Sequence, residues 1–136
     1  MNISQITGVY FSPTGSTKRV TEWITERIAG NREAECLDLT DAASSRPDYT
    51  FTEHELAVVG VPVYGGRVPE TARERLQKIH GKRTPAVLIV TYGNRAYEKA
   101  LMELDAFAIP HGLKVIAGAT FIGEHSYSTD KCPIAD

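Results

Sequence analysis

The chain has 136 residues, of which 42% are hydrophobic and 24% are charged, and its formal net charge is −2. This length suits a single domain around one core, with residues 124–136 as a polar tail. The mild charge offers no basic surface for nucleic acid, and no apolar run is long enough to cross a membrane. Two cysteines without metal-ligand spacing and the absence of a signal-peptide pattern predict a protein of the reducing cytoplasm.

Apolar runs alternate with amphipathic stretches along the chain. Five strands are expected, at residues 3–11, 34–39, 55–63, 85–91 and 113–122. Three helices are expected, at residues 16–29, 69–79 and 95–108, and residues 40–54 are expected to form a long polar loop. Strands that alternate with helices imply a parallel sheet with right-handed crossovers. The second strand is the most polar, which places it at an edge.

The turn between the first strand and the first helix is unusually rich in hydroxyl groups. It reads Ser-Pro-Thr-Gly-Ser-Thr over residues 12–17, whereas one serine or threonine is enough to cap a helix. A helix start presents unpaired N–H groups and the positive end of the macrodipole, which together bind phosphate. The turn therefore predicts a phosphate-bearing ligand, and the alternative is an ordinary capped turn.

Two further loops, residues 62–67 and 92–97, follow apolar strands and contain glycine and tyrosine. Ligands of open parallel sheets bind beyond the carboxyl ends of the strands, so the three loops are expected to meet. Tyr64 and Tyr97 could stack on a flat ring, although Tyr97 also fits core packing. Arg67 could meet an anion or the solvent. A phosphate loop beside two such loops is the layout of a flavin mononucleotide (FMN) site.

Other phosphate-binding patterns are missing from the sequence. The Walker motif and the dinucleotide motif GxGxxG do not occur. A phosphatase loop needs a cysteine where Ser12 stands, and a receiver domain needs an aspartate at the same strand end. These patterns give no support to nucleotide hydrolysis or phosphatase chemistry.

Residues 12–17 resemble the phosphate loop of flavodoxins. The segments GVPVYGGRVP, TYGNRAYEKAL and GEHSYSTDKCPIAD resemble, more narrowly, the flavodoxin-like domain that is fused to bacterial ferredoxin modules. The resemblance implies an α/β doubly wound sheet of five parallel strands in the order 2-1-3-4-5, with FMN as cofactor. It implies that the phosphate is held by Ser12, Thr14, Gly15, Ser16 and Thr17. It implies that the ring lies among Pro62, Val63, Tyr64, Gly65, Gly66, Tyr92, Gly93, Asn94 and Tyr97.

The implied function is electron transfer, as a module of a larger flavin and iron–sulfur protein. The implied partner is a redox protein or an adjacent iron–sulfur module, and no side chain is assigned a catalytic or metal-binding role. Two alternatives stay open: a binding or scaffold module that keeps the fold without flavin, and an FMN-dependent reductase. The last helix of the family is not predicted here, so one face of the sheet is expected to be covered by a second copy or by the tail.

Overall fold

The computed structural model describes residues 2–40, 48–64, 67–92 and 98–122. Its strands are β1 (Gln5–Tyr10), β2 (Glu33–Asp38), β3 (Tyr49–Thr50), β4 (Glu55–Pro62), β5 (Ile79–His80), β6 (Thr84–Tyr92) and β7 (Leu113–Ile122). Its helices are α1 (Ser16–Ala29), α2 (Glu70–Leu76) and α3 (Glu98–Ala108). None of these helices is long and apolar enough to span a membrane. The tail predicted at 124–136 lies outside the described residues.

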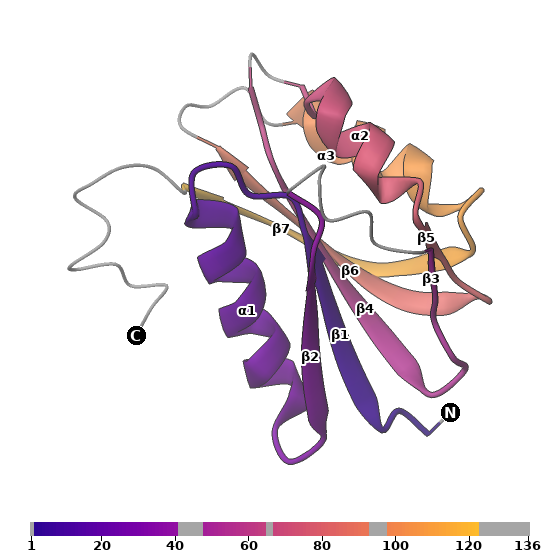
Figure 1. Ribbon diagram of the computed structural model, residues 1–136. Helices are drawn as coiled ribbons and strands as arrows, with labels where there is room; N and C mark the ends of the chain where they lie inside the picture. Colours follow the sequence, from indigo (N-terminus) through magenta and orange to yellow (C-terminus); the bar gives the residue numbers. More distant parts are fainter. Residues whose placement is uncertain (1, 41–47, 65–66, 93–97, 123–136) are drawn as a thin grey trace.

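Five parallel strands form the main sheet in the order β2-β1-β4-β6-β7, which is the predicted order. The polar strand β2 lies at one edge, as predicted, and β7 forms the other. The inner strands β1 and β4 are almost continuously buried because helices cover both of their faces. This arrangement is the predicted α/β doubly wound fold (Figure 1).

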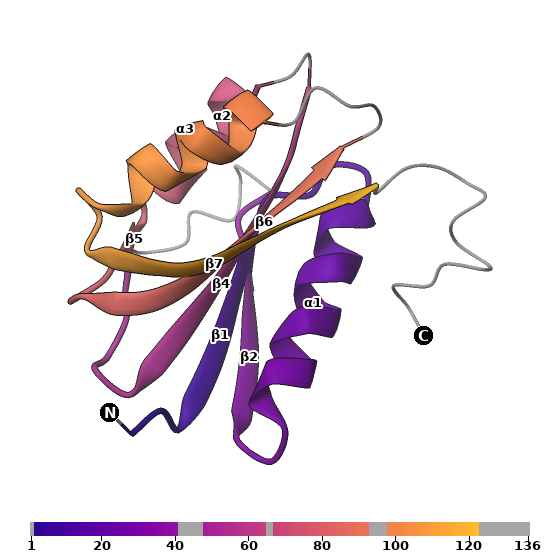
Figure 2. The same ribbon diagram turned by 180° about the vertical axis from the view of Figure 1, so that it is seen from behind.

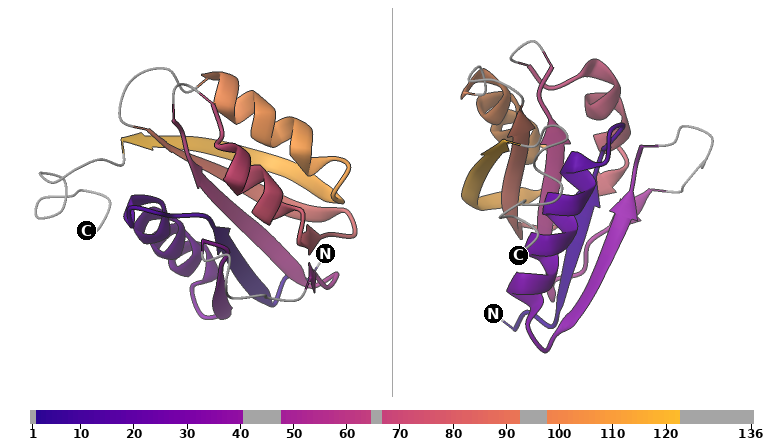
Figure 3. Two further views of the ribbon diagram at one scale, coloured as in Figure 1. Left: turned by 45° about the horizontal axis from the view of Figure 1, so that its top comes forward. Right: turned by 90° about the vertical axis from the view of Figure 1, so that its left-hand side faces the viewer.

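Helices cover the two faces unequally. The larger core lies under α2 and α3, where Leu76 and Leu104 pack against strand residues such as Val59. The smaller core lies under α1, where Val20 packs with Ile6. Figures 2 and 3 show α1 on one side of the sheet and α2 and α3 together on the other.

Threonines of α1 face glycines of the sheet. A Cβ atom built on Gly60 would lie 2.0 Å from Thr21 Oγ1, and one on Gly8 would lie 2.5 Å from Thr25 Oγ1. Only a residue without a side chain leaves room for α1 at this distance from the sheet. The start of the helix is therefore held close to the ends of β1 and β4.

The predicted second helix is too long at its C-terminal end, and the predicted loop contains a strand. The helix α2 ends at Leu76, and Ile79 lies in β5, which pairs with β3. Ile79 continues the apolar spacing of the helix, but it is buried as part of a strand. Tyr49 N donates to the carbonyl of Lys78, and this pairing replaces another helical turn.

A buried carboxylate, Glu55, fixes the other end of the sheet. It accepts hydrogen bonds from the hydroxyls of Thr7 and Tyr49, from Gln5 Nε2 at 3.0 Å and from Thr52 N at 2.6 Å. These donors supply the partners that a buried carboxylate requires. Burial, followed by the hydrogen bond to Glu55 and its negative charge, raises the pKa of Tyr49 to about 12.

Candidate functional site

The three predicted loops begin at the same end of the sheet, which we call the carboxyl edge. Tyr10 pairs with Gly60 in the ladder of β1 and β4, and Pro62 pairs with Thr91 in the ladder of β4 and β6. The chain therefore leaves three neighbouring strands at one edge, where α1 also starts (Figure 1).

The hydroxyl of Ser12 organises the first loop. Its Oγ accepts from Gly15 N at 3.1 Å and from Lys18 N at 2.9 Å, so it caps α1 from outside the helix. Gly15 has φ of 96°, a left-handed conformation that glycine adopts without steric cost. Thr40 holds the loop from behind, since its Oγ1 accepts from Ser12 N at 2.8 Å.

Two N–H groups at this helix start remain open. The hydrogen bonds of the described residues give no acceptor to the N–H groups of Ser16 and Thr17. The first turn of α1 contains no acidic side chain, and Thr14 is exposed beside it. This part of the loop presents donors and the positive end of a helix dipole, as an anion requires.

The hydroxyl of Thr17 points away from the loop surface. Its Oγ1 lies 2.6 Å from Thr91 Oγ1, and the two residues are 1% and 3% exposed. Thr17 therefore offers its N–H group to a ligand, whereas its hydroxyl is bonded to Thr91 of the sheet. Sequence analysis missed Thr91 because it reads as an ordinary strand residue at the end of an apolar run.

The second loop combines buried and exposed residues. Val63 is buried in the larger core, while the neighbouring Tyr64 is 49% exposed. Tyr64 and Arg67 exchange backbone hydrogen bonds of 2.9 and 3.1 Å in an isolated antiparallel bridge. Pro62 is buried as well, and Gly65 and Gly66 lie outside the described residues. The tyrosine ring is thereby accessible next to the carboxyl edge.

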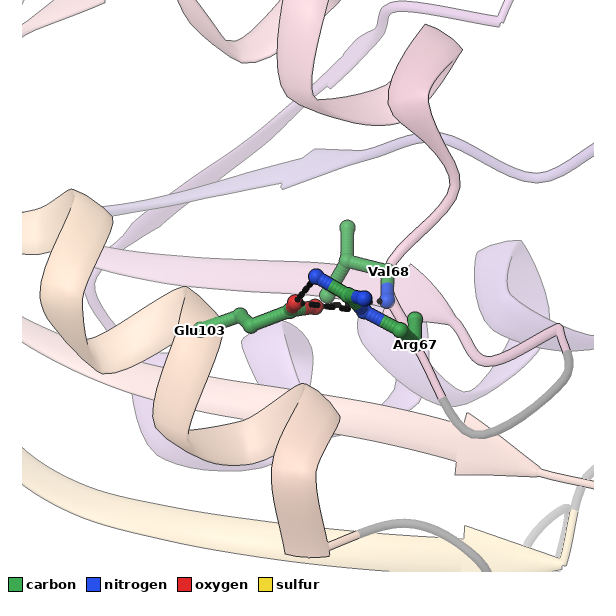
Figure 4. Close-up of polar contacts among 3 residues, drawn as sticks. All are labelled: Arg67, Val68 and Glu103. Carbon is green, nitrogen blue, oxygen red and sulfur yellow. Dashed lines mark hydrogen bonds and ion pairs between the residues drawn. The ribbon is translucent and has the colours of Figure 1, made fainter.

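Arg67 is held by α3 (Figure 4). Its guanidinium contacts Glu103 Oε2 at 2.6 and 2.8 Å, and Glu103 Oε1 accepts from Val68 N at 3.0 Å. Partial burial alone would raise the pKa of Glu103, but the hydrogen bonds from Val68 and Arg67 and nearby positive charge outweigh it and lower that pKa. Arg67 is therefore paired with a carboxylate, and the second loop is tied to α3.

The third loop is described only at its start. Tyr92 is the last residue of β6, and the predicted site residues Gly93, Asn94 and Tyr97 lie outside the described residues. The two readings of Tyr97, ring stacking and core packing, are thus left as predictions.

A family model described as "Flavodoxin domain" matches residues 9–127. The chain belongs to the flavodoxin domain family. The matched region contains the whole phosphate loop and both of the other loops. The order of the five parallel strands in this flavodoxin domain is the order that the resemblance implied. Among curated protein sequences, none matches this chain significantly.

Solved structures of flavodoxins share the fold at low sequence identity. A solution structure of two-electron reduced flavodoxin from Megasphaera elsdenii has a TM-score of 0.61 at 18% identity, covering 90% of this chain and 89% of that one. A flavoprotein from Lactobacillus acidophilus, in complex with FMN, has a TM-score of 0.59 at 18% identity, covering 94% and 97%. The Flv1 flavodiiron core from Synechocystis has a TM-score of 0.62 at 16% identity, and the match covers 96% of this chain but 34% of that larger one.

Proposed function

We propose that this chain is an FMN-binding electron-transfer domain. The observation that carries the proposal is the start of α1, where Ser16 and Thr17 offer two N–H groups without acceptors among the described residues. A phosphate at this point would meet donors and no acidic side chain in the first turn. Family membership supports the choice of ligand, as does the related Lactobacillus flavoprotein with FMN.

The remaining residues of the site fit the other end of such a ligand. Tyr64 offers a half-exposed aromatic face beside the carboxyl edge, suited to packing on a flat ring. The ion pair with Glu103 holds Arg67, whose backbone pairs with that of Tyr64. When bound, FMN would supply the redox chemistry, and the protein's part is to bind and orient it.

We also propose that the domain exchanges electrons with an adjacent iron–sulfur module or with another redox protein. It would do so as a module of a larger flavin and iron–sulfur protein in the cytoplasm. The net charge of −2 supports this, because it provides only a weak field for steering a diffusing partner. Electron-transfer rates with external acceptors should then depend little on salt, and a steep salt dependence would contradict the assignment.

We also propose that a second copy covers the face of β6 and β7 on the side of α1. The helix α1 packs mainly on β1, β2 and β4, so Val87 and Phe121 are only partly buried there and Ala117 is exposed. Light scattering should give a dimer that Phe121→Asp converts to a monomer. A monomeric wild-type protein would contradict this part of the proposal.

The test of the main proposal is direct flavin binding. The purified protein should be yellow, and heating should release FMN; a colourless protein that takes up no added FMN would refute the assignment. Tyr64→Ala should weaken FMN and riboflavin binding alike because it removes a ring contact. Ile109→Ala is the matched control, since Ile109 is also exposed but follows the C-terminal end of α3, away from the carboxyl edge.

The same preparation separates the two alternative functions. A folded protein that binds no flavin would favour a scaffold or binding module. A protein that oxidises a nicotinamide or reduces a quinone at a saturable rate would favour an FMN-dependent reductase.

A further inference from the structure

Thr91 is connected to the three loops of the carboxyl edge, to two by hydrogen bonds and to the third through the chain. Its hydroxyl is hydrogen-bonded to the hydroxyl of Thr17 at 2.6 Å, which connects it to the phosphate loop. Its carbonyl accepts from Val63 N at 2.8 Å, which connects it to the loop of Tyr64. It is also the residue before Tyr92, where the third loop begins.

We propose that Thr91 is a positioning residue that sets the phosphate site relative to the ring site. The inference rests on the proposed FMN function and assigns a role to a residue outside the predicted ligand contacts. Thr91 acts through Thr17: it fixes the second residue of α1, and so it fixes the direction of the N–H groups that face the phosphate.

Because it is buried, this hydrogen bond favours one position of the start of α1. Thr17 and Thr91 are 1% and 3% exposed, so water does not compete for either hydroxyl. If the start of α1 shifted, both buried hydroxyls would lose their hydrogen bond, which costs free energy. The pair therefore favours one position of the helix start.

The next threonines of α1 do not duplicate this connection. The buried hydroxyl of Thr21 has no partner among the described residues, and Thr25 Oγ1 donates to the carbonyl of Thr21 within the helix at 2.7 Å. Near the start of α1, the side-chain link to β6 is thus the bond between Thr17 and Thr91.

The experiment compares FMN with riboflavin, which has the same ring and no phosphate. Dissociation constants are measured by quenching of flavin fluorescence for wild type, Thr91→Val and Thr91→Ser. Loss of the hydroxyl should weaken FMN binding about tenfold, in line with the loss of one buried hydrogen bond, and leave riboflavin binding nearly unchanged. Serine restores the hydroxyl and should restore the preference for FMN.

Thr84→Val is the matched control. Thr84 is buried at the opposite end of β6, and its Oγ1 accepts from Lys82 N at 3.1 Å. This variant removes the acceptor of the Lys82 N–H group, so it should lower stability. It should not change the ratio of the FMN and riboflavin dissociation constants. If Thr91→Val does not fold, the double variant Thr17→Val/Thr91→Val leaves no orphaned hydroxyl and should show the same reduced ratio.

Each outcome is decisive. A selective loss of FMN affinity that serine restores supports the positioning role. An unchanged ratio in Thr91→Val, or an equal fall in Thr84→Val, overturns it while the FMN function stands. A wild-type protein that binds no FMN overturns the proposed function, and the positioning role falls with it.

Discussion

Replacement of Gly60 by alanine tests how closely α1 packs on the sheet. The added methyl would lie 2.0 Å from Thr21 Oγ1 and 3.2 Å from Thr17 Cγ2. Thr21 is β-branched, so rotation about χ1 offers little relief, and α1 has to move outward. Overpacking of this kind costs about 1–3 kcal/mol. We expect a loss of about 2–3 kcal/mol in unfolding free energy, or about 8 °C in melting temperature.

Urea unfolding followed by circular dichroism measures this loss. In Gly60→Ala/Thr21→Ala the 2.0 Å contact disappears and the nearest remaining contacts are 3.2 and 3.3 Å, so most of the stability should return. Gly118→Ala is the control, because its Cβ would meet nothing nearer than Leu101 Cδ1 at 3.6 Å. The reasoning is refuted if Gly60→Ala costs no more than Gly118→Ala, or if the alanine at position 21 gives no recovery.

Three further substitutions test other parts of the fold. Glu103→Gln should cost under about 1 kcal/mol at neutral pH because the pair with Arg67 is partly exposed. Since the pKa of Glu103 is lowered in the folded protein, that difference is present above pH 4.5 and should fade in acid unfolding curves as pH falls through the lowered pKa. The pKa of Tyr49 is raised to about 12 by burial and by Glu55, so wild type should lose unfolding free energy as pH rises from 10 to 12. Tyr49→Phe should lack this loss because phenylalanine has no hydroxyl to titrate, and alkaline unfolding curves of the two proteins check this. Leu104→Ala, at a side chain 1% exposed, should cost about 2–5 kcal/mol in urea unfolding, and a loss below 1 kcal/mol would contradict its place in the core.

Most strands and helices of the main sheet could be predicted from local sequence patterns. The run that ends at Phe11 and the apolar stripe that includes Val20 predict a strand and a helix, and the structure has both. The polar residues of β2 predicted its position at an edge of the sheet, and the resemblance to flavodoxins implied the full strand order; the structure has both. The hydroxyl-rich turn lies where the alternation of strand and helix places it.

Features that depend on distant pairs were missed. β3 and β5 are two residues each, too short to show a periodic pattern, and they exist because Tyr49 meets Ile79. The bond between Thr17 and Thr91 joins residues 74 positions apart, and nothing near either residue indicates the other. In the candidate site, composition thus predicts which loops take part, whereas the contacts that align them require the folded chain.

The all-parallel ladder has a consequence for how quickly this chain folds. No neighbouring strands of the main sheet can form as a hairpin, because each pairing needs a crossover first. Gln5 must meet Glu33 across a helix and Glu55 across a still longer span. Loop-closure entropy therefore opposes every early strand pairing. Refolding is expected to be slower than for a helical bundle of this size, with β1 and β2 pairing around α1 as the shortest closure.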